Sequence, residues 1–184
     1  MKVMNKLIIV GSAGSPNNAI KILNTNVELK IPVILNIHFS KQFIPGFAEH
    51  IKKITKQKVT IVKGKTKLSP GIYIPDIGKS LKFLSENTVN SFIYNNAIAL
   101  PSINTLFSSL IKYANSTFYI FVLSGLGNDG QETLKKLEEN NVHFFIQKNP
   151  KIFYLTENYR KSLKNYLLAD IDEMREILKK INKE

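Results

Sequence analysis

The sequence contains no cysteine among its 184 residues. This absence excludes cysteine nucleophiles, disulfides and thiolate-bound zinc or iron–sulfur sites, and it fits a reducing, cytoplasmic compartment. Long hydrophobic runs are also missing, since those at 7–10 and 118–123 fall far short of the roughly 20 residues that span a bilayer. The apolar stretch near the N-terminus is too brief for a secretory signal. We therefore expect a cytoplasmic chain without insertion into a membrane.

Arginine is scarce although the formal net charge is +12. Only Arg160 and Arg175 are arginines among 26 basic residues, whereas recognition of phosphates and bases favours the forked guanidinium group. Isoleucine and asparagine are abundant together with lysine, at 24 and 19 residues. This joint enrichment indicates a coding bias of the gene more than a selected binding surface. A positive net charge alone indicates solubility and non-specific contacts, not a specific partner. We expect no nucleic-acid partner.

Sequence motifs that bind metals or nucleotides are absent as well. The three histidines are scattered and form no H-E-x-x-H pattern, so no metal site is predicted. The segment GSAGSP at 11–16 lacks the third glycine of a dinucleotide-binding loop, and no G-K-[ST] follows. The second predicted strand ends in His38, where a dinucleotide fold normally has an acid. No cofactor is therefore predicted.

Short apolar runs alternate with amphipathic helical patterns along the chain. The runs lie at 7–11, 32–38, 59–62, 118–125 and 143–147, and the helical patterns lie at 15–24, 43–56, 102–111 and 130–140. Continuous apolar runs of this length are typical of strands that helices cover on both faces. We predict a single domain over residues 1–184 with a body at 7–147. Its fold class is α/β, a three-layer α/β/α sandwich around a mostly parallel, doubly wound sheet.

Two segments depart from this alternation. Between 59 and 96, short strand-like runs and turn residues predict a β-hairpin region. The C-terminal tail at 157–182 is predicted to be helical, with one helix over 159–168. A second helix follows, opened by a capping box of Asp170 with Glu173.

Three of the predicted strands end in residues that can carry chemistry. Ser12 follows the first strand, His38 ends the second, and Asp129 lies in the glycine-rich loop after the strand at 118–125. The carboxyl ends of parallel strands meet at one edge of a sheet, so these side chains are predicted to be neighbours. In a Ser-His-Asp system the imidazole takes the serine proton and the carboxylate fixes the tautomer of the imidazole. The alternative stays open that Ser12 is a turn residue, His38 is structural and Asp129 caps the helix after it.

The order of five segments resembles a known family. They read IVGSAGSP, PVILNIHFSKQFIPGFAEHI, KLSPGIYIP, LPSINTLFSSL and VLSGLGNDGQETLKKLEENNVHFFIQ. Together they are similar to the catalytic domain of CheB, the chemotaxis protein-glutamate methylesterase, over residues 7 to 147. The more specific parts are G-x-G-x-D-G at 125–130 and P-S-x-x-x-L-F at 101–107.

This resemblance implies a role for each site residue. Ser12 would be the nucleophile, His38 the general base and Asp129 the orienting acid. Residues around the substrate and its oxyanion would be Ala13, Leu126 and Gly127. No cofactor or metal is implied.

The resemblance also implies the reaction and the partner. The reaction would remove methyl esters from glutamyl residues on the cytoplasmic helices of methyl-accepting chemoreceptors, and deamidation of glutamine stays open. The chain is expected to be a stand-alone catalytic domain without the receiver domain of the family. Departures from the family pattern at Ala13, Ser15 and Ile37 leave an alternative, which is a catalytically weakened CheB-like binding or regulatory module in chemotaxis signalling.

Overall fold

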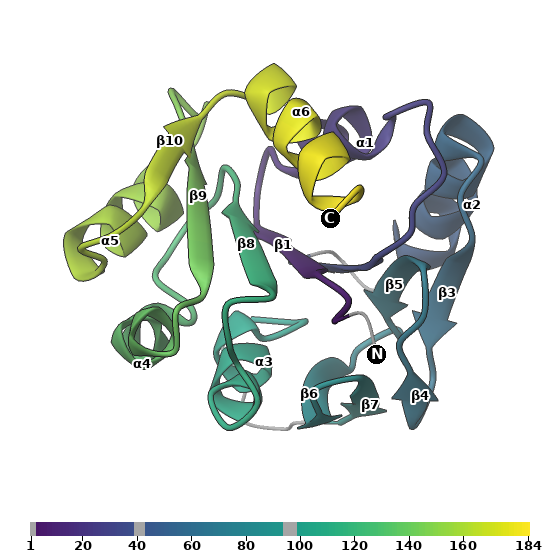
Figure 1. The fold of residues 1–184 in the computed structure, drawn as a ribbon, viewed down its shortest axis with the longest axis horizontal. Helices are drawn as coiled ribbons and strands as arrows, with labels where there is room; N and C mark the ends of the chain where they lie inside the picture. The colour runs from purple at the N-terminus through teal and green to yellow at the C-terminus, as the bar shows by residue number, and fades with distance from the viewer. Residues whose placement is uncertain (1–2, 39–42, 94–98) are drawn as a thin grey trace.

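A parallel sheet of seven strands runs through the molecule, with helices on both faces (Figure 1). The computed structural model describes residues 3–38, 43–93 and 99–184. In spatial order the strands are β10 (Leu167–Ala169), β9 (His143–Gln147), β8 (Phe118–Val122), β1 (Lys6–Gly11), β2 (Pro32–Ile37), β5 (Gly71–Pro75) and β3 (Val59–Val62). The prediction of a doubly wound parallel sheet is confirmed.

Side chains of the central strands alternate between two apolar cores. In β1, Leu7 and Ile9 belong to one core, while Ile8 and Val10 belong to the other. The first core is covered by α1 (Pro16–Leu23), α2 (Ile44–Thr55) and α6 (Ile171–Ile181). The second is covered by α3 (Ile103–Leu110), α4 (Leu134–Glu139) and α5 (Tyr154–Ser162), with a 3-10 turn, η2 (Gln131–Thr133), before α4. Burial on both faces explains why these strands are continuous apolar runs.

The predicted hairpin region at 59–96 forms a hairpin only in part. β6 (Ser80–Ser85) and β7 (Thr88–Phe92) pair antiparallel, and β4 (Thr66–Lys67) pairs with β7 to complete a small sheet. In contrast, β3 and β5 belong to the main sheet, where β5 is fully buried between β2 and β3. Ser80 Oγ accepts a hydrogen bond of 2.9 Å from the Ser102 N–H, which ties the small sheet to the start of α3. The end of the predicted region, at 94–96, lies outside the described residues.

The predicted tail helix over 159–168 is wrong in its bounds. α5 begins at Tyr154 and ends at Ser162, and the residues of β10 form an edge strand that pairs with β9. This long-range pairing overrides the helical pattern of the local sequence. The capping box at the start of α6 is confirmed, since Asp170 and Glu173 each accept a hydrogen bond from the other's backbone N–H.

The chain connections diverge at the carboxyl ends of β1 and β8, which are neighbours in the sheet. From β1 the chain continues through α1 to β2 on one side, and from β8 it continues through α4 to β9 on the other side. Open α/β sheets bind ligands where the connections diverge in this way. Within the three described ranges, no helix is both long enough and apolar enough to cross a membrane.

Helix α6 packs against α1, so its buried side chains should contribute to the stability of the fold. Leu178 is fully buried, so Leu178→Ala should lower the free energy of unfolding by about 2–5 kcal/mol through lost apolar contacts and a cavity. Lys180→Ala, on the exposed side of the same helix, should change it by less than about 0.5 kcal/mol. Chemical denaturation measures both values, and equal effects would contradict the packing.

Candidate active site

Ser12 lies in the turn that leaves β1, next to the end of β2. Gly11 pairs with Ile37 in the parallel register, and the N–H of His38 donates to the Gly11 carbonyl at 3.1 Å. On the other side, the N–H of Ser12 donates to the Ser124 carbonyl at 2.9 Å. The sheet therefore places Ser12 and His38 at adjacent strand ends, as predicted.

His38 and Asp129 are in direct contact. The His38 Nε2 atom lies 2.9 Å from Asp129 Oδ2, and the two side chains are only 14% and 19% exposed. A carboxylate only accepts hydrogen bonds, so Nε2 carries the proton and Nδ1 is left as the basic atom of a neutral ring. Among the described residues, the Ser12 hydroxyl makes no hydrogen bond to this ring.

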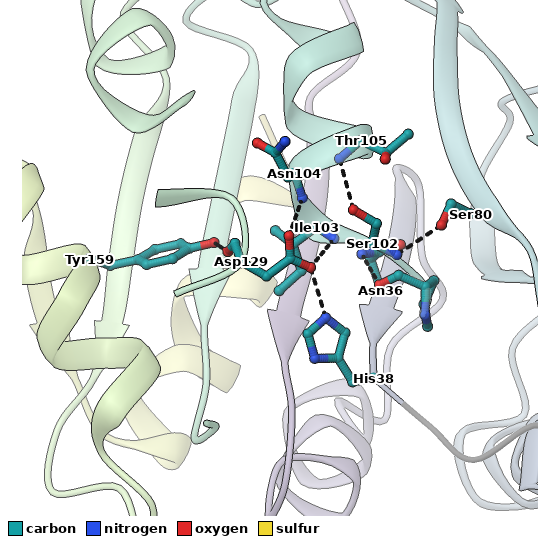
Figure 2. Close-up of polar contacts among 10 residues, drawn as sticks. Asn36, His38, Ser80, Ser102, Ile103, Asn104, Thr105, Asp129 and Tyr159 are labelled. Carbon is teal, nitrogen blue, oxygen red and sulfur yellow. Dashed lines mark hydrogen bonds and ion pairs between the residues drawn. The ribbon is translucent and has the colours of Figure 1, made fainter. Parts of the chain in front are cut away.

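The Asp129 carboxylate also binds the start of α3 (Figure 2). Oδ2 accepts a 2.7 Å hydrogen bond from the Ile103 N–H, and Oδ1 accepts one of 2.9 Å from the Asn104 N–H. The side chain of Ser102 accepts from the Thr105 N–H at 3.1 Å. Asp129 is thus a capping residue, but it caps α3 and not the helix that follows it in sequence.

These contacts determine the charge of the carboxyl group. Burial by itself would raise the pKa of Asp129, but hydrogen bonds from His38, Ile103 and Asn104 lower this pKa below its ordinary value. The N-terminal end of a helix also favours negative charge. Asp129 is therefore ionised at neutral pH and can hold the imidazole in one tautomer.

Backbone N–H groups without partners occur in the turn after Ser12 and in the loop after β8. Within the described part of the chain, the N–H groups of Ala13, Leu126 and Gly127 make no hydrogen bond. The loop after β8 is close to the serine, because a Cβ atom on Gly125 would lie 2.7 Å from the Cβ of Ser12. An N–H group without a partner is free to donate to an oxygen that gains negative charge.

Several supporting residues were not predicted from the sequence. The buried Ser124 hydroxyl lies 3.0 Å from the Ala13 carbonyl and 3.1 Å from that of Ile152, which joins the two loops. Tyr159 donates to the backbone carbonyl of Asp129. No local signal in the sequence marks these contacts, because each partner is more than 25 residues away.

Two clefts flank the site. One, of about 560 Å³, is lined by Gly14, Pro16, Asn17, Ile20, Phe43, Gly46, Phe47 and His50. The other, of about 480 Å³, is lined by Asn104, Asn128, Asp129, Gly130, Gln131, Glu132 and Ser162. Neither is lined by Ser12 or His38, so the contacts of these residues locate the site better than cleft volume does. Over the described ranges, no group of three or more metal-ligating residues is found.

Comparison with known proteins identifies the family. The family model described as CheB methylesterase matches residues 7–158, which is most of the chain. The chain belongs to the CheB methylesterase family. This confirms the resemblance inferred from the five sequence segments.

Individual CheB relatives agree with this assignment. The "Protein-glutamate methylesterase/protein-glutamine glutaminase 3" of Leptospira interrogans is 26% identical over 156 residues, covering 78% of this chain and 43% of the relative. The "Protein-glutamate methylesterase/protein-glutamine glutaminase 2" of Methanospirillum hungatei is 29% identical over 146 residues, covering 77% and 42%. Each match therefore spans less than half of the curated relative.

A solved CheB structure shows the same fold. The crystal structure of the Thermotoga maritima CheB methylesterase catalytic domain matches with a TM-score of 0.82 over 99% of both chains. Its sequence identity to this chain is 16%, so this likeness concerns the fold alone.

The Asp129 contacts predict an acid-dependent contribution to stability. A carboxyl group whose pKa is lowered on folding stabilises the protein above its unfolded pKa, and this stabilisation is lost as pH falls through the folded pKa. Asp129→Asn should cost about 1–3 kcal/mol at pH 7 through loss of charged hydrogen bonds. The difference from wild type should shrink as pH falls below the ordinary value of 3.8. Denaturation at several pH values measures this difference.

The matched control for this experiment is Asp172→Asn. The Asp172 side chain is 80% exposed and pairs with Arg175 on the same helix. Its replacement should change stability by less than about 1 kcal/mol. A difference between wild type and Asp129→Asn that stays constant down to pH 2 would contradict the lowered pKa.

Proposed function

We propose that this chain hydrolyses methyl esters of glutamyl residues in chemoreceptor proteins. Ser12 is the nucleophile, His38 the general base and Asp129 the residue that orients the base. The observation that carries the proposal is the 2.9 Å contact between His38 Nε2 and Asp129 Oδ2, at the strand end next to Ser12. Membership of the CheB family and the names of the relatives support the choice of reaction.

In the first step Ser12 becomes acylated. Ser12 Oγ attacks the ester carbonyl carbon while Nδ1 of His38 takes the hydroxyl proton. The carbonyl oxygen becomes an oxyanion, for which Ala13, Leu126 and Gly127 supply the unpaired N–H groups. The carbon–oxygen bond to the methoxy group then breaks, and the imidazolium returns its proton to the leaving group. Methanol departs and the glutamyl acyl group remains on Ser12.

In the second step water releases the acyl group. Nδ1 of His38 takes a proton from water, and the hydroxide attacks the acyl carbon. The bond to Ser12 Oγ breaks, the imidazolium reprotonates the serine, and a glutamate carboxylate is released. The same cycle with a glutamine side chain would release ammonia, which is the second activity in the relatives' names.

The proposed substrates are the cytoplasmic helices of methyl-accepting chemoreceptors. Their methylation sites are glutamates, so the sites that are not esterified make the surface presented to the enzyme acidic. A chain with a net charge of +12 is attracted to such a surface, and this attraction acts mainly on the association rate and weakens with salt.

The test of the proposed function is methanol release from a methylated receptor. Ser12→Ala and His38→Ala should each lower turnover by about 10³-fold or more. Because the two residues act as one unit, the double variant should be little slower than the slower single variant. Ser116→Ala, which alters an exposed serine outside the site, is the matched control and should keep full activity.

Two results would count against this assignment. If Ser12→Ala retained most of the wild-type turnover, Ser12 would not be the nucleophile. If the folded wild-type chain bound receptor but released no methanol or ammonia, the alternative of a CheB-like binding module would be favoured. Circular dichroism of each variant establishes that the protein is folded before turnover is compared.

A further inference from the structure

Helix α5 lies directly behind the loop that carries Asp129. The Tyr159 hydroxyl donates a hydrogen bond to the backbone carbonyl of Asp129 (Figure 2). The Tyr159 side chain is completely buried, and its ring packs against Phe107 of α3 with centroids 6.5 Å apart. Tyr159 therefore contacts both the loop of the carboxylate and the helix that the carboxylate caps. It lies one residue beyond the segment that the family model matches.

Gly130 leaves the space that the Tyr159 hydroxyl occupies. A Cβ atom at Gly130 would lie 2.7 Å from the hydroxyl oxygen and 2.8 Å from Cγ2 of Ile103. Its φ angle of +85° also favours glycine. A side chain at position 130 would therefore collide with the Tyr159 hydroxyl and with Ile103, the first residue of α3.

Further contacts join α5 to the same loop. The side chain of Asn158 donates to the Gly127 carbonyl at 2.9 Å, and the N–H of Leu155 donates to the Gly125 carbonyl at 2.9 Å. In the opposite direction, Gln131 Nε2 donates to the Asn158 carbonyl at 3.1 Å. The loop is therefore held by α5 at its beginning, its middle and its end.

We propose that Tyr159 is a positioning residue for Asp129. By fixing the Asp129 peptide, its hydroxyl keeps the carboxylate where it reaches the His38 ring and the N–H groups of Ile103 and Asn104 together. The effect on turnover rests on the proposed function, whereas the effect on the loop does not.

The chemistry of a buried tyrosine suits this role. Burial, and then the nearby charge of Asp129, raise the pKa of Tyr159 well above its ordinary value. The hydroxyl therefore stays a neutral donor at every pH at which the enzyme could work. Phenylalanine would keep the ring and its packing but would leave the Asp129 carbonyl without this donor.

The first experiment compares Tyr159→Phe with Tyr73→Phe. Tyr73 is a matched control, because it is 3% exposed and its hydroxyl bonds to the Ser69 backbone away from the site. Tyr159→Phe should lower kcat for methanol release by about 10-fold with KM within about twofold, because small misplacements of catalytic groups slow the reaction more than they weaken binding. Tyr73→Phe should leave both constants within about twofold.

The second experiment is hydrogen exchange, which needs no enzyme activity. The amides of Ile103 and Asn104 donate to the Asp129 carboxylate, so Tyr159→Phe should speed their exchange about 10-fold relative to the β1 amides. Tyr73→Phe should leave the exchange rates of these two amides unchanged relative to β1. The β1 reference removes any effect of global destabilisation.

The two experiments separate failure of this inference from failure of the proposed function. A wild-type chain without esterase activity would contradict the proposed function, and exchange would still decide the role of Tyr159. Unchanged exchange at Ile103 and Asn104, or an equal loss of kcat in Tyr73→Phe, would overturn the inference. If Tyr159→Phe does not fold, Asn158→Ala removes a different hydrogen bond from α5 to the same loop, the one to the Gly127 carbonyl, with an expected loss in kcat of about threefold.

Discussion

The Asp129 carboxylate is shared between two parts of the protein, the imidazole of His38 and the first turn of α3. A buried carboxylate is stable as an anion only when donors replace the water it has lost. Here one ring N–H and two backbone N–H groups supply them, so a single charge satisfies the helix and orients the ring. The capped start of α3, the ionisation of Asp129 and the tautomer of His38 therefore depend on the same carboxylate.

Close backbone approach is the second constraint, and it follows from the first. For Asp129 to reach His38, the loop after β8 must pass beside Ser12, and Gly125 allows this because a Cβ atom there would overlap Ser12. At the end of the loop, Gly130 admits the Tyr159 hydroxyl. Both glycines lie in the stretch that carries the family resemblance. Gly125 is explained by its contact with Ser12, and Gly130 by its contact with Tyr159 together with its positive φ angle.

The sequence predicted what depends on local pattern and missed what depends on distant partners. Strands such as β1 and β8 are apolar on both faces, and their ends placed Ser12, His38 and Asp129 at one edge. The run that forms β5 was assigned to a hairpin and that of β10 to a helix, because only pairing with β2 and β9 decides their structure. Capping of α3 by Asp129 could not be read locally either, since 26 residues separate Asp129 from Ile103.

The sharing of Asp129 also bears on how charge would be distributed during the proposed reaction. When His38 takes the serine proton, the ring becomes a cation beside Asp129, and the proton on Nε2 could pass to the carboxylate. The N–H groups of Ile103 and Asn104 oppose this transfer, because they stabilise the carboxylate in its charged form and keep its pKa low. The proton would stay on the imidazole, and Asp129 would stabilise the imidazolium as an ion pair. Capping of α3 and support of a general base then require the same property of one residue, a carboxylate that remains ionised.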